Sequence, residues 1–222
     1  MIPIPQQLTF RPFQAHDFAT LSQVIRQTWH YDLFLPPAAA RRQANAFLSA
    51  CLAEQTFTQV ALDQGTPVGI IMGKDLRAPH PPFSLRLRAL GHILLLLLSR
   101  PGRAIARFYQ QIDAVDRNLL QRTGHQYQGE LSFFVVHPDW RGKGVGKALY
   151  QAFLDHMAQQ QVRDFYVFTD TSCHYPFYER QGMVLCGQQT LPLTMEHTHK
   201  EITFFIYDHR PEYEVHSHGL TL

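Results

Sequence analysis

Residues 130–148 read ELSFFVVHPDWRGKGVGKA, and this stretch decides the fold. The largely apolar run from Leu131 to Val136 is typical of a buried strand, and a His-Pro-Asp sequence ends it. Three glycines follow, and an amphipathic helix is predicted from Gly144 onward. A strand, a glycine loop and a helix start in this order leave free backbone N–H groups together, which suits an anionic phosphate group.

Three kinds of phosphate-binding loop compete for this segment. A magnesium-nucleotide loop requires serine or threonine after Gly146-Lys147, but residue 148 is alanine. A dinucleotide loop requires a third glycine at a position that holds lysine or leucine here. The remaining pattern is Arg-x-x-Gly-x-Gly, which Arg141, Gly144 and Gly146 match. Lys143 and Lys147 add positive charge, so the segment predicts a pyrophosphate loop rather than a purely structural turn.

Composition limits the classes of protein that the chain can represent. Its 222 residues, 45% of them hydrophobic, fit a single domain spanning residues 1–222. A net charge of +2 without a long basic run gives no sign of nucleic-acid binding. Three widely separated cysteines favour a reducing compartment, and the N-terminus resembles no secretory signal. No apolar run approaches the roughly 20 residues of a membrane span, so we expect a cytoplasmic protein without a membrane partner.

The order of predicted elements indicates an α/β fold with a mixed, mostly antiparallel sheet. One parallel β-α-β crossover is expected around residues 130–171, with helices on both faces of the sheet. Predicted strands cover residues 8–12, 58–63, 67–74, 130–136, 164–171, 183–191 and 202–208. One predicted helix begins after Asp17, which is expected to cap it, and three more cover residues 38–54, 144–160 and 175–181.

A helical insertion is predicted at about residues 84–122, between two strands. Its first half is leucine-rich, and its second half carries apolar residues on one face. Core packing is the favoured interpretation of this insertion. A lid, a wall of a substrate channel and a dimer surface are the alternatives, so a homodimer is possible.

Two segments resemble the GCN5-related N-acetyltransferase (GNAT) superfamily, which transfers an acyl group from coenzyme A to an amine. The first is VVHPDWRGKGVGKAL at residues 135–149, and the second is FYERQGM, Phe177–Met183, which is similar to the family's FYxxxGF segment. The resemblance implies a GNAT-like fold and direct transfer of acetyl from acetyl-CoA to a primary amine. It implies that backbone groups of the central strand bind the pantetheine arm and that the loop binds the pyrophosphate. The cofactor-binding residues implied are Phe134, Val135, Val136, Arg141, Gly142, Lys143, Gly144, Val145, Gly146, Lys147 and Thr171.

The same resemblance implies two catalytic residues. Tyr178 would assist the departing thiolate, although it could instead pack its helix against the sheet. Glu130 would take a proton from the amine, although it could be a solvated strand end, and Asp170 and His174 are other candidate bases. Thr171 stands where many members of the family have asparagine, which places the local geometry in doubt.

Other possibilities remain open at this stage. Cys173 has no legible His-Asp partner, so a covalent acyl-enzyme is not expected. The histidines at 196–199 and 216–218 do not cluster with cysteines, so we expect no metal. The acceptor, a small-molecule or peptide amine, is unidentified, and Trp29, His30, Tyr31 and Phe34 are candidates for its wall. A non-catalytic acyl-CoA sensor or scaffold of the same fold is the alternative function, and another acyl donor is compatible with the loop.

Overall fold

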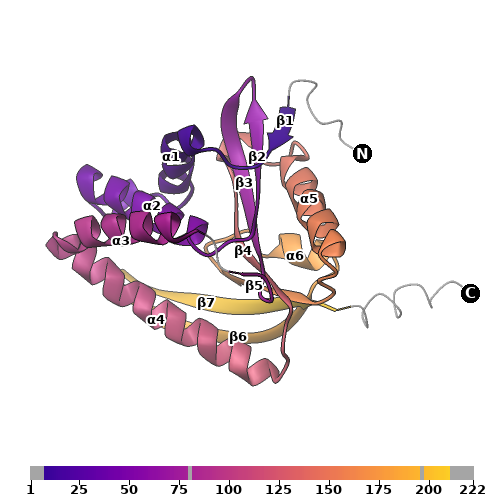
Figure 1. The fold of residues 1–222 in the computed structure, drawn as a ribbon. Coiled ribbons are helices and arrows are strands. Elements are labelled where there is room, and N and C mark those ends of the chain that lie inside the picture. The colour runs from indigo at the N-terminus through magenta and orange to yellow at the C-terminus, as the bar shows by residue number, and fades with distance from the viewer. Residues whose placement is uncertain (1–7, 80–81, 196–197, 211–222) are drawn as a thin grey trace, which may run out of the picture.

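A computed structural model describes residues 8–79, 82–195 and 198–210 of the chain. Within these residues seven strands form one sheet in the order β1-β2-β3-β4-β5-β7-β6 (Figure 1). The β4–β5 pair is parallel, and the other neighbouring strands described are antiparallel. The strands are β1 Leu8–Arg11, β2 Phe57–Asp63, β3 Thr66–Asp75, β4 Gly129–Val136, β5 Phe165–Asp170, β6 Val184–Met195 and β7 Thr198–His209. The expected mixed, mostly antiparallel sheet is therefore confirmed.

Helices cover both faces of this sheet. They are α1 Phe18–Thr28, α2 Pro37–Leu52, α3 Phe83–Leu97, α4 Arg100–Thr123, α5 Val145–Gln159 and α6 Pro176–Arg180, with short 3-10 turns at Ala15–Asp17, Tyr31–Leu33 and Pro138–Trp140. One core lies between α1, α2 and the faces of β2, β3 and β4, and a second lies beneath α5. Helix α5 sits so close to β3 that a Cβ on Gly73 would come within 2.5 Å of the Phe153 ring. Glycine is thus required at this helix–sheet contact.

The predicted elements and the observed ones agree closely, with a few corrections. Asp17 precedes α1, but its carboxylate does not cap the helix. It accepts a hydrogen bond from the Gln14 N–H at 2.8 Å and pairs with Arg11 at 2.6 Å instead. Strands β6 and β7 extend beyond the predicted limits of residues 191 and 202. The histidines at 197 and 216–218 lie outside the described residues. In the part of the chain that is described, the helices are all too short or too polar to cross a membrane.

The two helices of the insertion differ in how they pack. Helix α4 lies along β6 and β7, and its Val115 and Leu119 are buried against Tyr166, Phe204 and Ile206 (Figure 1). Helix α3 lies against α2 and α4, and its buried residues are Ala89 and Leu96. Core packing is therefore confirmed for α4, whereas for most of the leucines of α3 it was the wrong interpretation.

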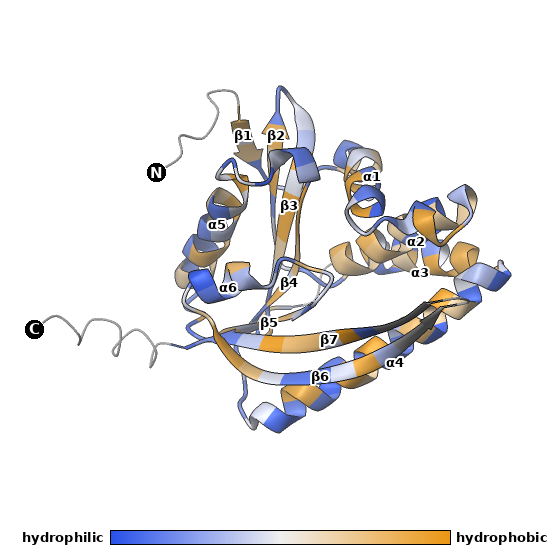
Figure 2. Ribbon diagram, turned by 180° about the vertical axis from the view of Figure 1, so that it is seen from behind, coloured by the Kyte–Doolittle hydropathy of each residue, from blue (hydrophilic) through white to orange (hydrophobic). Residues whose placement is uncertain are grey.

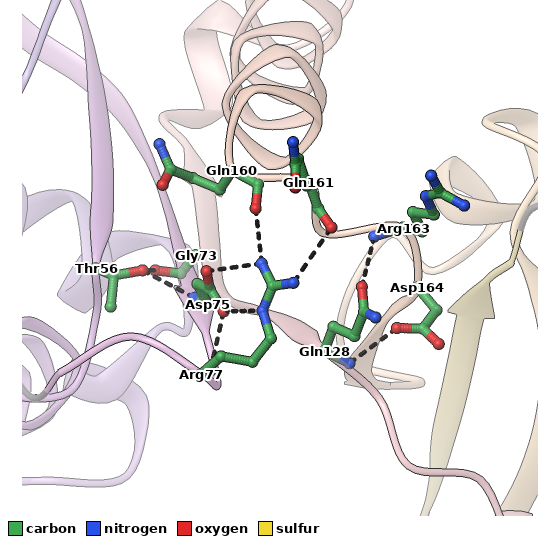
Figure 3. Close-up of polar contacts among 9 residues, drawn as sticks. All are labelled: Thr56, Gly73, Asp75, Arg77, Gln128, Gln160, Gln161, Arg163 and Asp164. Atoms are coloured by element: carbon green, nitrogen blue, oxygen red, sulfur yellow. Dashed lines mark hydrogen bonds and ion pairs between the residues drawn. The ribbon is translucent and has the colours of Figure 1, made fainter.

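A cluster of polar contacts links the segments that lead into β4 and β5 (Figure 3). The Arg77 guanidinium donates to the carbonyl oxygens of Gln160 and Gln161, at 2.7 and 3.3 Å, beyond the end of α5. It also pairs with Asp75 at the end of β3, at 2.9 Å. The Gln128 N–H donates to the Asp164 carboxylate at 2.9 Å, which joins the residues leading into β4 and β5. These bonds hold the two strands together at this end.

Candidate active site

Strands β4 and β5 separate from each other soon after they begin. Their register contains two pairs, Gly129 with Phe165 and Glu130 with Tyr166. From residue 131 to residue 136, β4 remains paired with β3 but not with β5. The side of β4 that faces β5 therefore presents backbone groups without a neighbouring strand, and such groups need hydrogen-bond partners. An extended ligand can supply them.

A β-bulge at Ser132 sets which side chains of β4 face this opening. Met72 pairs with Phe133 and Gly73 pairs with Leu131, so Ser132 is the extra residue on β4. In a regular strand Leu131 and Phe133 would share a face, but here Leu131 packs beneath α5 whereas Phe133 packs beneath α1 and α2. The bulge thereby turns Phe134 toward α5 and α6, where its ring meets Phe177 edge-on at 5.4 Å.

Two glycines shape the loop that follows β4. Gly142 and Gly144 have φ angles of 74° and 82°, in the left-handed region that favours glycine. Gly144 is the N-cap of α5, and the first hydrogen bond in this helix runs from the Ala148 N–H to the Gly144 carbonyl at 3.0 Å. The N–H groups of residues 145–147 are therefore directed out of the helix start, where the helix dipole is positive. This arrangement fits a pyrophosphate.

The basic side chains of the loop are held in two different ways. The Arg141 Nε donates to the Val136 carbonyl at 3.3 Å, which places this guanidinium beside the end of β4. The Lys143 ammonium lies 4.7 Å from the centre of the Trp140 ring. Both side chains are exposed and thus accessible to an anion.

Three of the predicted cofactor-binding residues can contribute only in restricted ways. The side chains of Val135 and Val145 are buried in the two cores, so only their backbone groups are available to a ligand. The Thr171 hydroxyl accepts a hydrogen bond from the Thr203 N–H at 3.3 Å. In this arrangement the threonine ties β7 to the end of β5 rather than replacing the family's asparagine in the opening. Its cofactor-binding role remains a prediction.

Tyr178 lies in α6, buried beside the second core. It is 8% exposed and packs against the rings of Phe177 and Tyr207. Burial raises its pKa well above 10, and the nearby Cys173 and Tyr150 add to this shift. The phenol therefore remains protonated at neutral pH and can donate a hydrogen bond.

The other groups at the end of β5 are poorly suited to proton abstraction or nucleophilic attack. Burial, aided by Asp170, raises the pKa of the Cys173 thiol to about 11, so it is protonated at neutral pH. The Asp170 carboxylate accepts from the Ser172 N–H at 2.6 Å, and the exposed His174 ring lies 2.6 Å from the Arg180 guanidinium. These positions favour local structural roles for Asp170 and His174.

Glu130 is not a solvated strand end. Its side chain is 16% exposed, and its carboxylate lies 3.1 Å from the Lys74 ammonium. It also accepts a hydrogen bond from the Tyr166 hydroxyl at 3.3 Å. Lys74 pairs with Glu54 at 2.8 Å as well, and the two carboxylates outweigh burial and raise the pKa of this lysine. Glu130 is thus already engaged as the partner of a charged ammonium.

Asp116 of α4 is a second carboxylate in this region, and the sequence analysis missed it. Its Oδ1 atom is buried and has no hydrogen-bond partner among the described residues. Burial, together with the carboxylates of Asp113, Glu130 and Asp170, raises the pKa of Asp116 to about 7. Asp116 follows Val115, which packs with Tyr166 of β5, and its carboxylate is close enough to Glu130 and Asp170 for their charges to affect it. It is a carboxylate that can gain or lose a proton near neutral pH.

Asp116 is not marked as a functional residue by its place in the sequence. It lies four residues after Ile112 and three residues before Leu119, at the border of the apolar face of α4. A carboxylate at such a position is either exposed to solvent or buried because it has a function, and the sequence alone does not distinguish these cases.

Aromatic residues from α4 and from the end of α1 adjoin the same region. The hydroxyls of Tyr31 and Tyr109 lie 3.1 Å apart, and Trp29 stacks on Phe133 of β4 with the ring centres 6.0 Å apart. The predicted wall at Trp29 and Tyr31 therefore meets β4 and the inserted helix α4.

A sheet that opens between two parallel strands, next to a glycine loop and a helix start, defines an acyl-CoA-type acyltransferase fold. The profile of the acetyltransferase (GNAT) family matches residues 24–183. The chain belongs to this family. Among curated proteins no match is found.

Solved structures with the same fold share little sequence with the chain. A GCN5-related N-acetyltransferase from Kribbella flavida is 18% identical, with a TM-score of 0.53 over 93% of this chain and 99% of that one. The protein smu.2055 from Streptococcus mutans is 17% identical, with a TM-score of 0.54 over 91% and 98%. The protein yncA from Salmonella typhimurium, provisionally assigned as an acetyltransferase and solved with its cofactor acetyl-CoA, is 13% identical, with a TM-score of 0.50 over 90% and 93%. At these identities the similarity establishes the fold alone.

Proposed function

We propose that the protein is an N-acetyltransferase that transfers acetyl from acetyl-CoA directly to a primary amine. The observation that carries this proposal is the separation of β4 from β5 beyond Glu130, beside the N–H-rich start of α5. Membership of the GNAT family supports it. In this assignment residues 141–147 bind the pyrophosphate, and backbone groups of residues 134–136 bind the pantetheine arm.

Acetyl transfer requires the amine to lose a proton and the thiolate to be stabilised. The amine nitrogen attacks the thioester carbon, the carbon–sulfur bond breaks, and the amine proton passes to a base. We assign Tyr178 to the thiolate. Because its pKa is raised above that of a thiol, it acts by donating a hydrogen bond rather than by complete proton transfer.

The base is either Glu130 or Asp116, and the surroundings favour Asp116. Glu130 already binds the Lys74 ammonium, whereas Asp116 has a buried oxygen without a partner and a pKa of about 7. A carboxylate with this pKa is ionised in part at neutral pH and accepts a proton readily. Carboxylates near the opening also attract a positively charged amine, so we expect a cationic amine as the acceptor.

Two measurements test this function in sequence. Acetyl-CoA at about 100 times its Kd is expected to stabilise the protein by about 2.7 kcal/mol, which raises Tm by several degrees. A panel of amines, polyamines, amino acids and peptides is then tested for release of free coenzyme A thiol. Absence of a thermal shift at high concentration contradicts the donor assignment.

The alternative function, an acyl-CoA sensor without turnover, is distinguished by the second measurement. A sensor gives the thermal shift but no thiol release with any amine. An enzyme gives both, and its Tyr178→Phe variant retains the shift while losing most of the rate.

A further inference from the structure

Helix α3 is apolar on nearly all sides, yet most of it lies outside the core. Its sequence between Phe83 and Leu98 contains a run of leucines that Figure 2 colours largely as hydrophobic. Ala89 and Leu96 are its buried residues. A helix that is hydrophobic all round is normally enclosed by protein or placed in lipid. This exposed surface therefore indicates a partner.

The most exposed apolar side chains of α3 form one stripe. Their spacings of four, three, four and four residues place them on a single face of the helix, opposite Ala89 and Leu96. The stripe consists of Phe83, Leu87, Leu90, Leu94 and Leu98, which are 77, 59, 50, 55 and 75% exposed. Beside it a groove of about 680 Å³ is lined by Leu94, Leu95 and Leu98, with Arg88 at its edge.

The chain segment that carries this stripe contains basic residues and no acidic ones. Residues 76–112 contain six of the 20 lysines and arginines of the chain and none of its 18 aspartates and glutamates. Arg77 is paired with Asp75, but Arg86, Arg100, Arg103 and Arg107 are exposed. The remainder of the chain therefore carries a net negative charge. The segment that contains the apolar stripe is therefore basic, whereas the rest of the chain is acidic.

We propose that the α3 stripe docks onto the surface of an anionic lipid bilayer. The apolar side chains would enter the boundary between headgroups and acyl chains, with α3 parallel to the membrane plane, while the arginines contact lipid phosphates. A second copy of the chain fits this surface less well, because it would bring another set of arginines against the first one. The sequence predicts no membrane partner, whereas the exposed apolar surface of α3 favours one.

The test is sedimentation of the full chain with lipid vesicles. The protein is expected to pellet with vesicles of phosphatidylcholine and phosphatidylglycerol at low salt, and to be released at high salt. It is expected to remain in solution with phosphatidylcholine alone. Leu90→Asp together with Leu94→Asp should reduce the bound fraction at least tenfold. Arg86→Gln and Arg100→Gln should each weaken binding about fivefold.

A matched control keeps the result specific to α3. Leu185 on β6 is 42% exposed, and Leu185→Asp should bind vesicles like the original protein. Circular dichroism and Tm of each variant establish that it is folded. No pelleting with anionic vesicles, or equal pelleting of the Leu90/Leu94 variant, overturns the proposal. A dimer in light scattering that Leu94→Asp dissociates, without vesicle binding, also overturns it and assigns the stripe to a second copy.

Discussion

Replacing Asp116 by asparagine distinguishes the effect of this carboxylate on stability from its effect on catalysis. Burial and the carboxylates of Asp113, Glu130 and Asp170 raise the pKa of Asp116 from 3.8 to about 7 in the folded chain. Between these two values the folded chain holds a proton that the unfolded chain has released. Stability from this group is therefore lost as pH rises from about 4 to about 7, and the loss is complete above pH 7.

The size of the effect follows from the difference between the two pKa values. About three units at about 1.4 kcal/mol per unit give an upper limit of about 4 kcal/mol. Asparagine has nearly the same shape and no charge, so Asp116→Asn should raise the free energy of unfolding at pH 8 by about 2–4 kcal/mol. At pH 4 the two proteins should be nearly equal. If Asp116 is the base, the same variant should lose about 100-fold or more of kcat.

Urea unfolding at pH 4 and pH 8 measures the first effect, and thiol release across the same pH range measures the second. Asp155→Asn is the control, because Asp155 is an exposed carboxylate on α5 and is not among the groups that raise the pKa of Asp116, so its effect on stability should be small. If Asp116→Asn is no more stable than the original protein at pH 8, the ionised Asp116 carboxylate does not lower the free energy of unfolding. If it is more stable but equally active, Asp116 is not the base. A gain in stability with a loss of activity is the expected result.

Three further substitutions and one control variant test the donor side of the site. Tyr178→Phe should lower kcat about 10- to 100-fold and leave the Kd of acetyl-CoA unchanged, and an unaltered kcat removes the role we assign to its hydroxyl. Gly144→Ala should weaken acetyl-CoA binding in calorimetry because it strains a φ of 82° at the start of α5. Gly65→Ala strains an equal φ in the β2–β3 turn and should leave binding intact, so equal weakening by both contradicts the loop assignment. Cys173→Ala should retain at least a tenth of the rate of thiol release, since burial and Asp170 hold the pKa of this thiol near 11, and a greater loss points to covalent catalysis.

The glycine loop and the start of α5 could be predicted from the sequence because their requirements are local. A helix start leaves backbone N–H groups free and glycines favour a tight loop, and the spacing within residues 141–147 indicates both. The apolar run from Leu131 to Val136 also indicates a strand. The bulge at Ser132 could not be predicted, because it depends on how β3 pairs with β4 rather than on the residues of one strand.

The surface of α3 shows a different limit of sequence reasoning. A leucine-rich helix is most often a core helix, and only the packing of its neighbours reveals that Phe83 and Leu98 are exposed. The charge signal was present in the sequence, but it was hidden by averaging. A net charge of +2 combines an acid-free basic segment at residues 76–112 with a remainder that is acidic. Charge counted segment by segment would have separated them.

The acceptor side is the hardest to predict because its groups come from distant parts of the chain. The groups come from a turn (Tyr31), the inserted helix α4 (Tyr109 and Asp116) and the central strand β4 (Glu130). They approach one another only when these elements pack. No fixed spacing relates such groups, so neither periodicity nor a motif can detect them. In the function that we propose, the donor is bound by backbone geometry and the acceptor by side chains of the insertion. The specificity for the acceptor should therefore change when α4 is altered, whereas the affinity for coenzyme A should not.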